Sequence, residues 1–273
     1  MRNLILFWML VSFSPAFSQN LYDLANSKEF ASYLYRSQQY SLASIELERL
    51  LFIQPDNDTL RETLVRSYML NKDYVVSIKR LDSFFPNPRE IKKPFDDLFA
   101  YSLLADKKTE RARTFLSSNE TLELEKRQYY QAFSYLLEQD YKQADKLLSE
   151  IPNTNTTLAP LRDLSKEGVS MRHKSGGLAM AMSAIVPGSG KFYTGDWKDG
   201  IISLISIGVT GYQAIHGFQV KGTKSAYGWI YGTIATGFYL GNIYGSFTSA
   251  KRFNKRQSDR VAQKVDAAFS IQP

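Results

Sequence analysis

The chain has 273 residues, of which 44% are hydrophobic and 22% charged, and it contains no cysteine and only two histidines. This composition excludes disulfides, thiol catalysis and cysteine- or histidine-rich metal sites. The net charge of +7 is unevenly spread: residues 19–175 carry 23 basic and 23 acidic side chains, whereas residues 176–273 carry 10 and 4. Fifteen of the 16 glycines lie between residues 176 and 245. Two regions with different physical character therefore share the chain.

The first residues have the layout of a secretory signal. Arg2 precedes an apolar run at residues 4–13, Pro15 then ends any helix, and small residues follow. We predict a signal peptide over residues 1–18, cleaved after Ser18, which exports the chain. The alternative is an uncleaved anchor helix, although the apolar run is shorter than the about 20 residues that a bilayer core needs.

Residues 19–175 are predicted to form a helical repeat domain. Similar segments begin at Tyr40, Tyr74 and Tyr141, and the longer second gap leaves room for one more unit around Ala112. Small residues recur in columns, which lets antiparallel helices approach closely. The columns are Ala31, Val65, Ala100 and Ala132 in the first helices, and Ala43, Ser77, Ala112 and Ala144 in the second, each followed four residues later by Leu47, Leu81, Leu116 or Leu148.

A period near 34 residues with paired helices resembles the tetratricopeptide (TPR) repeat over residues 24 to about 155, although the tryptophan and glycine usual in the first helix are absent. The resemblance implies an α-solenoid of about four helix pairs, whose concave groove binds a peptide or partner protein through first-helix side chains. An irregular helical bundle is the alternative, and a solvated helix face is the alternative for each groove residue. The matching positions are Lys28, Ser32, Tyr35, Glu62, Arg66, Met69, Tyr129 and Phe133.

Residues 176–250 are predicted to form a glycine-rich membrane domain. Residues 200–218 and 226–248 contain no charged side chain, and both lengths suit a bilayer span. Residues 176–190 are also uncharged but short and interrupted by Pro187, so they form either a short span or a re-entrant segment. A helix in a soluble core is the alternative, disfavoured because glycine costs a helix in water nearly 1 kcal/mol each. The predicted fold class is thus all-α: a TPR-like solenoid followed by a hairpin or three-segment membrane domain.

A glycine motif lies at the start of this domain. Residues 183–200 are similar to the P-G-x-G-x-x-Y-x-G element of TM2-like and related small bacterial membrane domains, a resemblance that implies a compact helical hairpin and no agreed activity. The matching residues are Pro187, Gly188, Gly190, Tyr193, Gly195 and Gly200. Glycines in the last span have the small-xxx-small spacing that favours close helix packing, within the chain or in a homo-oligomer. They are Gly228, Gly232, Gly237, Gly241 and Gly245.

Residues 251–273 form a basic tail. Next to a membrane, its first basic residues are predicted to contact lipid headgroups; no aromatic platform accompanies them, so we expect no nucleic acid partner. A cleaved signal places the repeats in the periplasm, and three crossings would then place the tail in the cytoplasm, as the positive-inside rule prefers. Two crossings, the less favoured count, would leave the tail outside. The headgroup residues are Lys251, Arg252, Lys255 and Arg256.

No catalytic constellation is visible. The paired acids Asp96–Asp97 and Asp196/Asp199 have no histidine or nucleophile near them in sequence, so we predict a non-enzymatic protein without metal or cofactor. The leading hypothesis is an inner-membrane protein of the bacterial envelope whose periplasmic repeats scaffold or recruit a protein partner. The alternatives are an oligomeric pore or transport component regulated by the repeats, disfavoured because no charged residue lies in a span, and an assembly factor for envelope proteins.

Overall fold

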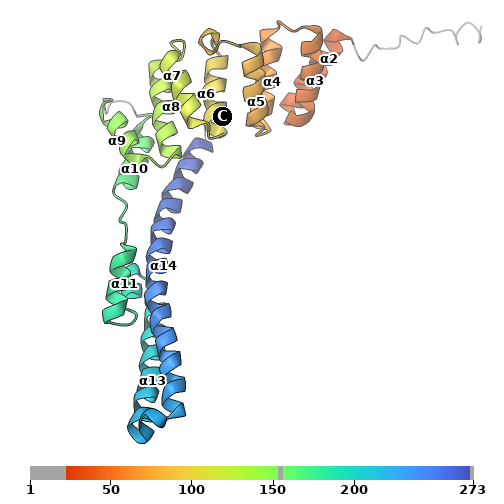
Figure 1. Cartoon of the computed structure of the whole chain (residues 1–273). Coiled ribbons are helices and arrows are strands. Elements are labelled where there is room, and N and C mark those ends of the chain that lie inside the picture. Colours follow the sequence, from red (N-terminus) through yellow and green to blue (C-terminus); the bar gives the residue numbers. More distant parts are fainter. Residues whose placement is uncertain (1–22, 153–155, 271–273) are drawn as a thin grey trace, which may run out of the picture. The chain divides into compact units, whose positions relative to one another are not determined.

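The computed structural model describes residues 23–152 and 156–270, and the predicted signal peptide lies outside these ranges. The described residues form thirteen α-helices and two short 3-10 helices with no strand, which confirms the all-α class (Figure 1). By its internal contacts the chain divides into two compact units, one ending at Tyr130 and the other beginning at Gln131. The division falls inside one helix, α8 (Leu124–Leu137).

The first unit consists of short helices that each pack against the next along the chain. Pro88, the first residue of the 3-10 helix, follows the end of α5, where proline cannot extend a helix. The helices are α2 (Leu24–Arg36), α3 (Tyr40–Ile53), α4 (Asp58–Leu70), α5 (Tyr74–Phe84), η1 (Pro88–Glu90), α6 (Phe95–Ala105), α7 (Thr109–Ser118) and the first part of α8.

The repeat columns predicted from the sequence are buried. Every small residue in the two columns is at most 2% exposed, and so is every leucine that follows the second column. The columns therefore mark where one helix crosses the next, as small residues at a crossing require. This burial is consistent across both units, since Ala132, Ala144 and Leu148 belong to the second.

The turn inside each predicted helix pair has the same unusual backbone. Its central residue is non-glycine with positive φ, between 56° and 64°. The N–H of the next residue donates to a carbonyl five residues back, for example from Asp73 to Tyr68 at 2.8 Å, which is the Schellman arrangement that ends a helix. A non-glycine residue there is under backbone strain. The four positions are Gln38, Lys72, Lys107 and Gln139.

We expect Lys72→Gly to stabilise the chain by about 1 kcal/mol, because glycine adopts positive φ without the Cβ clash. The matched control is Lys79→Gly inside α5, which should destabilise by about 1 kcal/mol. Thermal unfolding of the full chain, followed by circular dichroism at 222 nm, measures both. If the two glycines shifted Tm in the same direction, the turn would not carry the strain inferred here.

The second unit begins with the rest of α8 and continues with α9 (Tyr141–Ser149) and α10 (Ala159–Val169), which pack on each other. Buried Arg162 of α10 donates to the carbonyl oxygens of Leu148, Ile151 and Pro152 at 2.9 to 3.3 Å. It thereby satisfies the Leu148 carbonyl in the last turn of α9, which has no intrahelical partner, and two carbonyls of the segment that follows the helix. The glycine-rich part then forms α11 (Gly176–Ile185), α12 (Ser189–Thr194), α13 (Trp197–Lys221), η2 (Gly222–Lys224) and α14 (Ala226–Ser270).

Helix α14 is 45 residues long and runs without a break through the predicted boundary between membrane domain and basic tail. Its first part lies alongside α13 and α11, as Figure 1 shows. Its last part packs on α10, and Val261, Val265 and Phe269 are buried there at one-turn intervals. The Phe269 ring lies 5.1 Å from that of Phe133 on α8. The predicted tail is therefore a structural helix within the second unit.

Candidate functional sites

A groove of about 560 Å³ lies between α2 and α4 in the first unit. Four of the predicted groove residues line it: Lys28, Ser32 and Tyr35 from α2, and Arg66 from α4. Arg66 Nε donates to Glu62 Oε1 at 2.8 Å, so this cation is already paired. No described residue pairs with Lys28, which leaves its ammonium available to a ligand.

A second cavity of about 280 Å³ adjoins the first, because Arg66 lines both. Its walls carry two ion pairs, Lys93 Nζ to Glu123 Oε1 at 2.7 Å and Lys126 Nζ to Asp97 Oδ2 at 2.9 Å. Asp97 and Lys126 stand near the starts of α6 and α8, so successive first helices supply the lining. None of the four was predicted from the sequence to line the groove, although Asp97 was noted there as one of a pair of acids. The sequence feature that could have identified them is the presence of opposite charges near the starts of consecutive first helices.

Two predicted groove residues do not line an open groove. Tyr129 is 8% exposed and Phe133 is fully buried. Phe133 packs against Phe269, which lies in the predicted basic tail. Burial raises the pKa of Tyr129 to about 12, with the neighbouring Tyr101 contributing. Met69 lies on α4 but lines neither cavity.

Helix α13 exposes its apolar side chains. The stretch Trp197–Lys224 is, among the described residues, the one helix long and apolar enough to cross a membrane, with a mean hydropathy of 1.3 and only 11% of its apolar window buried. Ile202 is 62% exposed and Val209 is 54% exposed. The predicted second span, residues 226–248, is helical but rich in tyrosine and glycine, which lowers its hydropathy. An exposed apolar surface of this extent indicates an interaction with lipid or protein.

Each glycine of the motif has a structural explanation, either in its backbone conformation or in the lack of space for a side chain. Gly188 and Gly195 have φ of +87° and +86°. This is the left-handed conformation, which is strained for any residue that carries a side chain. A Cβ on Gly190 would lie 1.9 Å from the carbonyl oxygen of Ala179, so α12 contacts α11 through bare backbone. A Cβ on Gly200 would lie 3.1 Å from the Gly188 carbonyl oxygen. The motif therefore encodes a tight turn with close helix contacts.

The α11–α12 segment runs along α14 and turns back beside it. Going into α11, the N–H of Lys174 donates to Asn254 Oδ1 at 2.7 Å, and Ser183 Oγ bonds Ser246 Oγ at 2.6 Å. At the turn, the N–H of Gly188 donates to Asn242 Oδ1 at 3.1 Å. Coming back, Thr194 of α12 bonds Ser249 of α14. Both ends of α11–α12 therefore lie at the same end of the helical bundle, where α13 begins.

Tyr193 of the motif lies at this end, where Ser175 N–H donates to its hydroxyl at 3.3 Å. Pro187 occupies the turn between α11 and α12.

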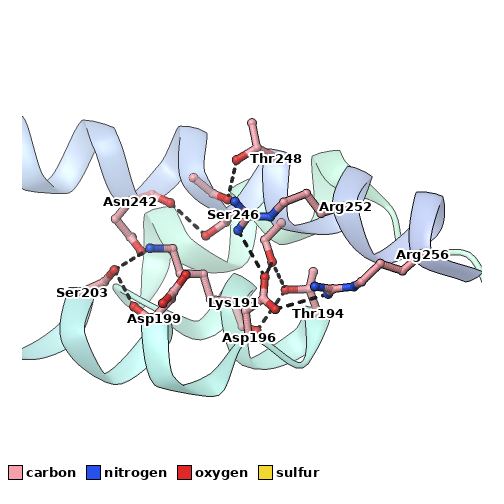
Figure 2. A network of polar contacts seen from close by, with 12 residues as sticks. Lys191, Thr194, Asp196, Asp199, Ser203, Asn242, Ser246, Thr248, Arg252 and Arg256 are labelled. Atoms are coloured by element: carbon pink, nitrogen blue, oxygen red, sulfur yellow. Dashed lines mark hydrogen bonds and ion pairs between the residues drawn. The ribbon is translucent and has the colours of Figure 1, made fainter.

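Asp196 joins this end of the bundle to the following part of α14 (Figure 2). Its carboxylate accepts from Ser249 Oγ and, at 3.3 Å each, from the guanidinium groups of Arg252 and Arg256. Burial acts to raise the pKa of Asp196, but these three hydrogen bonds hold the pKa below its usual value. Two of the basic residues predicted to contact lipid headgroups are thus bound within the protein. Lys251 lies 4.5 Å over the Phe247 ring, and Lys255 is exposed.

We expect Asp196→Asn to destabilise the bundle by about 1 to 2 kcal/mol at pH 7, since hydrogen bonds to a charged group are lost. Because the folded-state pKa is lowered, this stabilisation is present above the unfolded pKa and disappears as the pH falls through the folded one. The difference in Tm between wild type and variant should therefore shrink between pH 7 and pH 3. Melting curves of both proteins in non-ionic detergent test this, and a constant difference would contradict it.

The glycines of the predicted packing seam differ in how closely other atoms surround them. A Cβ on Gly228 would lie 2.8 Å from the Phe218 ring, so this glycine lets α14 contact α13. A Cβ on Gly245 would lie 3.3 Å from the Lys191 side chain, and one on Gly232 would lie 3.9 Å from its nearest neighbours. Nothing lies within 4 Å of a Cβ on Gly237 or Gly241. The last two are therefore open to lipid or to another helix.

No family model matches the chain, and no curated protein or solved structure is significantly similar to it.

Proposed function

We propose that this chain is a membrane-anchored scaffold of the bacterial envelope. Four TPR-like helix pairs bind an extended segment of a partner protein, and the α11–α14 bundle holds them at the inner membrane. The observation that carries the proposal is that successive first helices line one groove, while α13 of the same chain exposes an apolar surface. Stacked helix pairs use such grooves for protein recognition.

The chemistry of the groove supports an extended peptide as its ligand. The walls combine the Tyr35 ring, the Ser32 hydroxyl and two threonines with two cations, a mixture that suits backbone hydrogen bonds and one charged contact. Arg66, Lys93 and Lys126 are already paired with carboxylates. Lys28 is therefore the residue we assign to an acidic group of the partner.

Site-specific photo-crosslinking in cells tests this function. A photoreactive amino acid at Ser32, in the groove, should give a discrete adduct, whereas one at exposed Ser41 on α3 should not. Adding Lys28→Glu should reduce the adduct at least about tenfold, the range of an interface hot spot, while Lys79→Glu on α5 should not. Equal adducts from both positions, or no loss with Lys28→Glu, would refute recruitment through the groove.

The structure also bears on the orientation that we propose. The end of α14 packs against helices of the last predicted helix pair and α10: Lys264 Nζ pairs with Glu167 at 2.6 Å, and Ser258 Oγ donates to Gln139 at 2.6 Å. Segments in contact must lie on one side of a membrane. We therefore propose two crossings, α13 and the first part of α14, with α11–α12 as a re-entrant segment, in place of the three crossings favoured by the charge pattern alone.

This orientation places the turn with Lys221 and Lys224 in the cytoplasm. It is the one short loop between the two spans, and the positive-inside rule counts its two cations in favour of this orientation. The larger set of basic residues at the other end of the bundle favours the opposite orientation by charge alone, so the proposed orientation rests on the packing of α14 against the other helices of the second unit. The exported repeats and the end of α14 then both lie in the periplasm. The predicted signal peptide, as the first apolar segment of the chain, supports this direction.

Because the natural chain has no cysteine, single cysteines can map this topology with a membrane-impermeant maleimide. We expect Lys79→Cys and Gln263→Cys to react in intact spheroplasts, and Thr223→Cys to react only after the membrane is opened. All three positions are exposed in the structure. Three crossings would reverse the outcome for positions 223 and 263, and cytoplasmic repeats would reverse it for all three.

A further inference from the structure

We propose that three lysines at one end of the α11–α14 bundle, Lys174, Lys198 and Lys251, form a binding collar for anionic phospholipid headgroups. The inference rests on the membrane anchor proposed above and names its lipid partner. Of the four residues that the sequence pattern had assigned to this role, it keeps only Lys251. We call these three residues the lysine collar.

Each lysine of the collar lies over an aromatic ring. Lys174 Nζ is 4.4 Å from the centre of the Tyr193 ring, Lys198 Nζ is 5.8 Å from that of Trp197, and Lys251 Nζ is 4.5 Å from that of Phe247. These rings come from α12, α13 and α14. Cation–π contact orients an ammonium without neutralising it, so the full charge remains available to an anion.

The collar lies where the apolar surface of the bundle ends. The charge-free run of α13 begins at Gly200 and that of α14 ends at Thr248. Lys198 lies two residues before the first run, with the acidic Asp199 in between, and Lys251 lies three residues after the second. Lys174 is tied to the same level through the hydrogen bond between its backbone N–H and Asn254 of α14. Trp197, 54% exposed, has the amphipathic ring typical of the bilayer interface.

Charge pairing separates the collar from its neighbours. Arg252 and Arg256 share the carboxylate of Asp196, which reduces their attraction for an external anion. None of the three collar lysines has a carboxylate within ion-pair distance among the described residues. Residues 174–199 and 247–256 together contain seven basic and two acidic side chains, so the excess of positive charge persists after the Asp196 pairs form. A phospholipid phosphate is the anion found at this depth of a bilayer.

Lipid-dependent thermal stability of the full chain in non-ionic detergent tests the collar. Phosphatidylglycerol should raise Tm at lower concentration than phosphatidylcholine does. At roughly fivefold per lysine near an anionic surface, Lys174→Gln/Lys198→Gln/Lys251→Gln should raise the half-saturating phosphatidylglycerol concentration about 100-fold. The matched control is Lys79→Gln/Lys92→Gln/Lys142→Gln, which removes three exposed lysines from the helical repeats and should leave the titration unchanged.

Several results would overturn the collar. One is equal stabilisation by the two lipids, and another is an unchanged titration in the triple variant. A third is stabilisation by glycerol 3-phosphate alone, which would indicate a site for free phosphate. If the triple variant does not fold, Lys251→Gln alone still has to show an about fivefold shift. A protein that stays monodisperse without detergent would instead refute the membrane anchor itself.

Discussion

Gly190→Val is expected to disrupt the glycine-rich bundle and cost several kcal/mol of stability. The added Cβ would lie 1.9 Å from the carbonyl oxygen and 2.7 Å from the carbonyl carbon of Ala179, and this backbone cannot move aside as a flexible side chain can. Ser183 Oγ would also lie 2.7 Å away. The separation of α11 from α12 would also break the hydrogen bond from Gly190 N–H to Ser183 Oγ, at 3.0 Å, which continues to Ser246. Overpacking costs about 1 to 3 kcal/mol, and each buried polar group left unsatisfied adds about as much.

The controls for this prediction use glycines of the same bundle with open surroundings. Gly208→Val on α13 should change the free energy of unfolding by no more than about 1 kcal/mol, because no atom lies within 4 Å of a Cβ at this position. Melting in detergent, followed by tryptophan fluorescence, compares the variants. Equal losses for Gly190 and Gly208 would contradict the packing described here. A loss at Gly237, which is equally open, would indicate helix packing against a second copy.

Val265→Asp is expected to destabilise the second unit by about 3 to 5 kcal/mol, the cost of burying an unpaired charge. Val265 is 1% exposed and lies between the buried Val261 and Phe269 on the face of α14 that packs near α8 and α10. Loss of this contact should free the end of α14 from the helices it covers. Limited proteolysis of the full chain should then cleave α14 after the bundle, near Arg260.

The matched control is Ala267→Asp, which introduces the same charge on the exposed face of the same turn of α14. It should change the free energy of unfolding by no more than about 0.5 kcal/mol, as for an ordinary surface substitution. If Val265→Asp behaved like Ala267→Asp, α14 would not pack on the repeat helices in solution. The argument for two crossings, which depends on that contact, would then fail as well.

Local sequence patterns predicted much of this fold. The columns of small residues in the repeats are buried, since a helix crossing admits only small side chains on both partners. The motif glycines at Gly188 and Gly195 mark left-handed backbone, a requirement set by each residue alone. Four of the predicted groove residues line a real cavity because first helices present one face at constant spacing.

The errors arose where the covering partner is far away in the chain. Val261, Val265 and Phe269 have helical spacing and are buried, yet the basic residues before them led to the prediction of a basic tail that contacts lipid headgroups. Phe133 was assigned to an open groove for the same reason, since its neighbour Phe269 lies at the other end of the second unit's sequence. No local rule predicts which exposed face a distant helix will cover.

By itself, then, the sequence determined the all-helical class, the columns at the helix crossings and the charge-free run over residues 200–218. These depend on backbone conformation and on spacing of 3.6 residues per turn, both local properties. Only the tertiary structure decided that α11–α12 turns back along α14, that Asp196 binds Arg252 and Arg256, and that the end of α14 packs on repeat helices. The basic side chains behind the net charge of +7 therefore include arginines paired with a carboxylate of the same chain and lysines left for an external anion. Which residue belongs to which group depends on contacts between positions more than 50 residues apart.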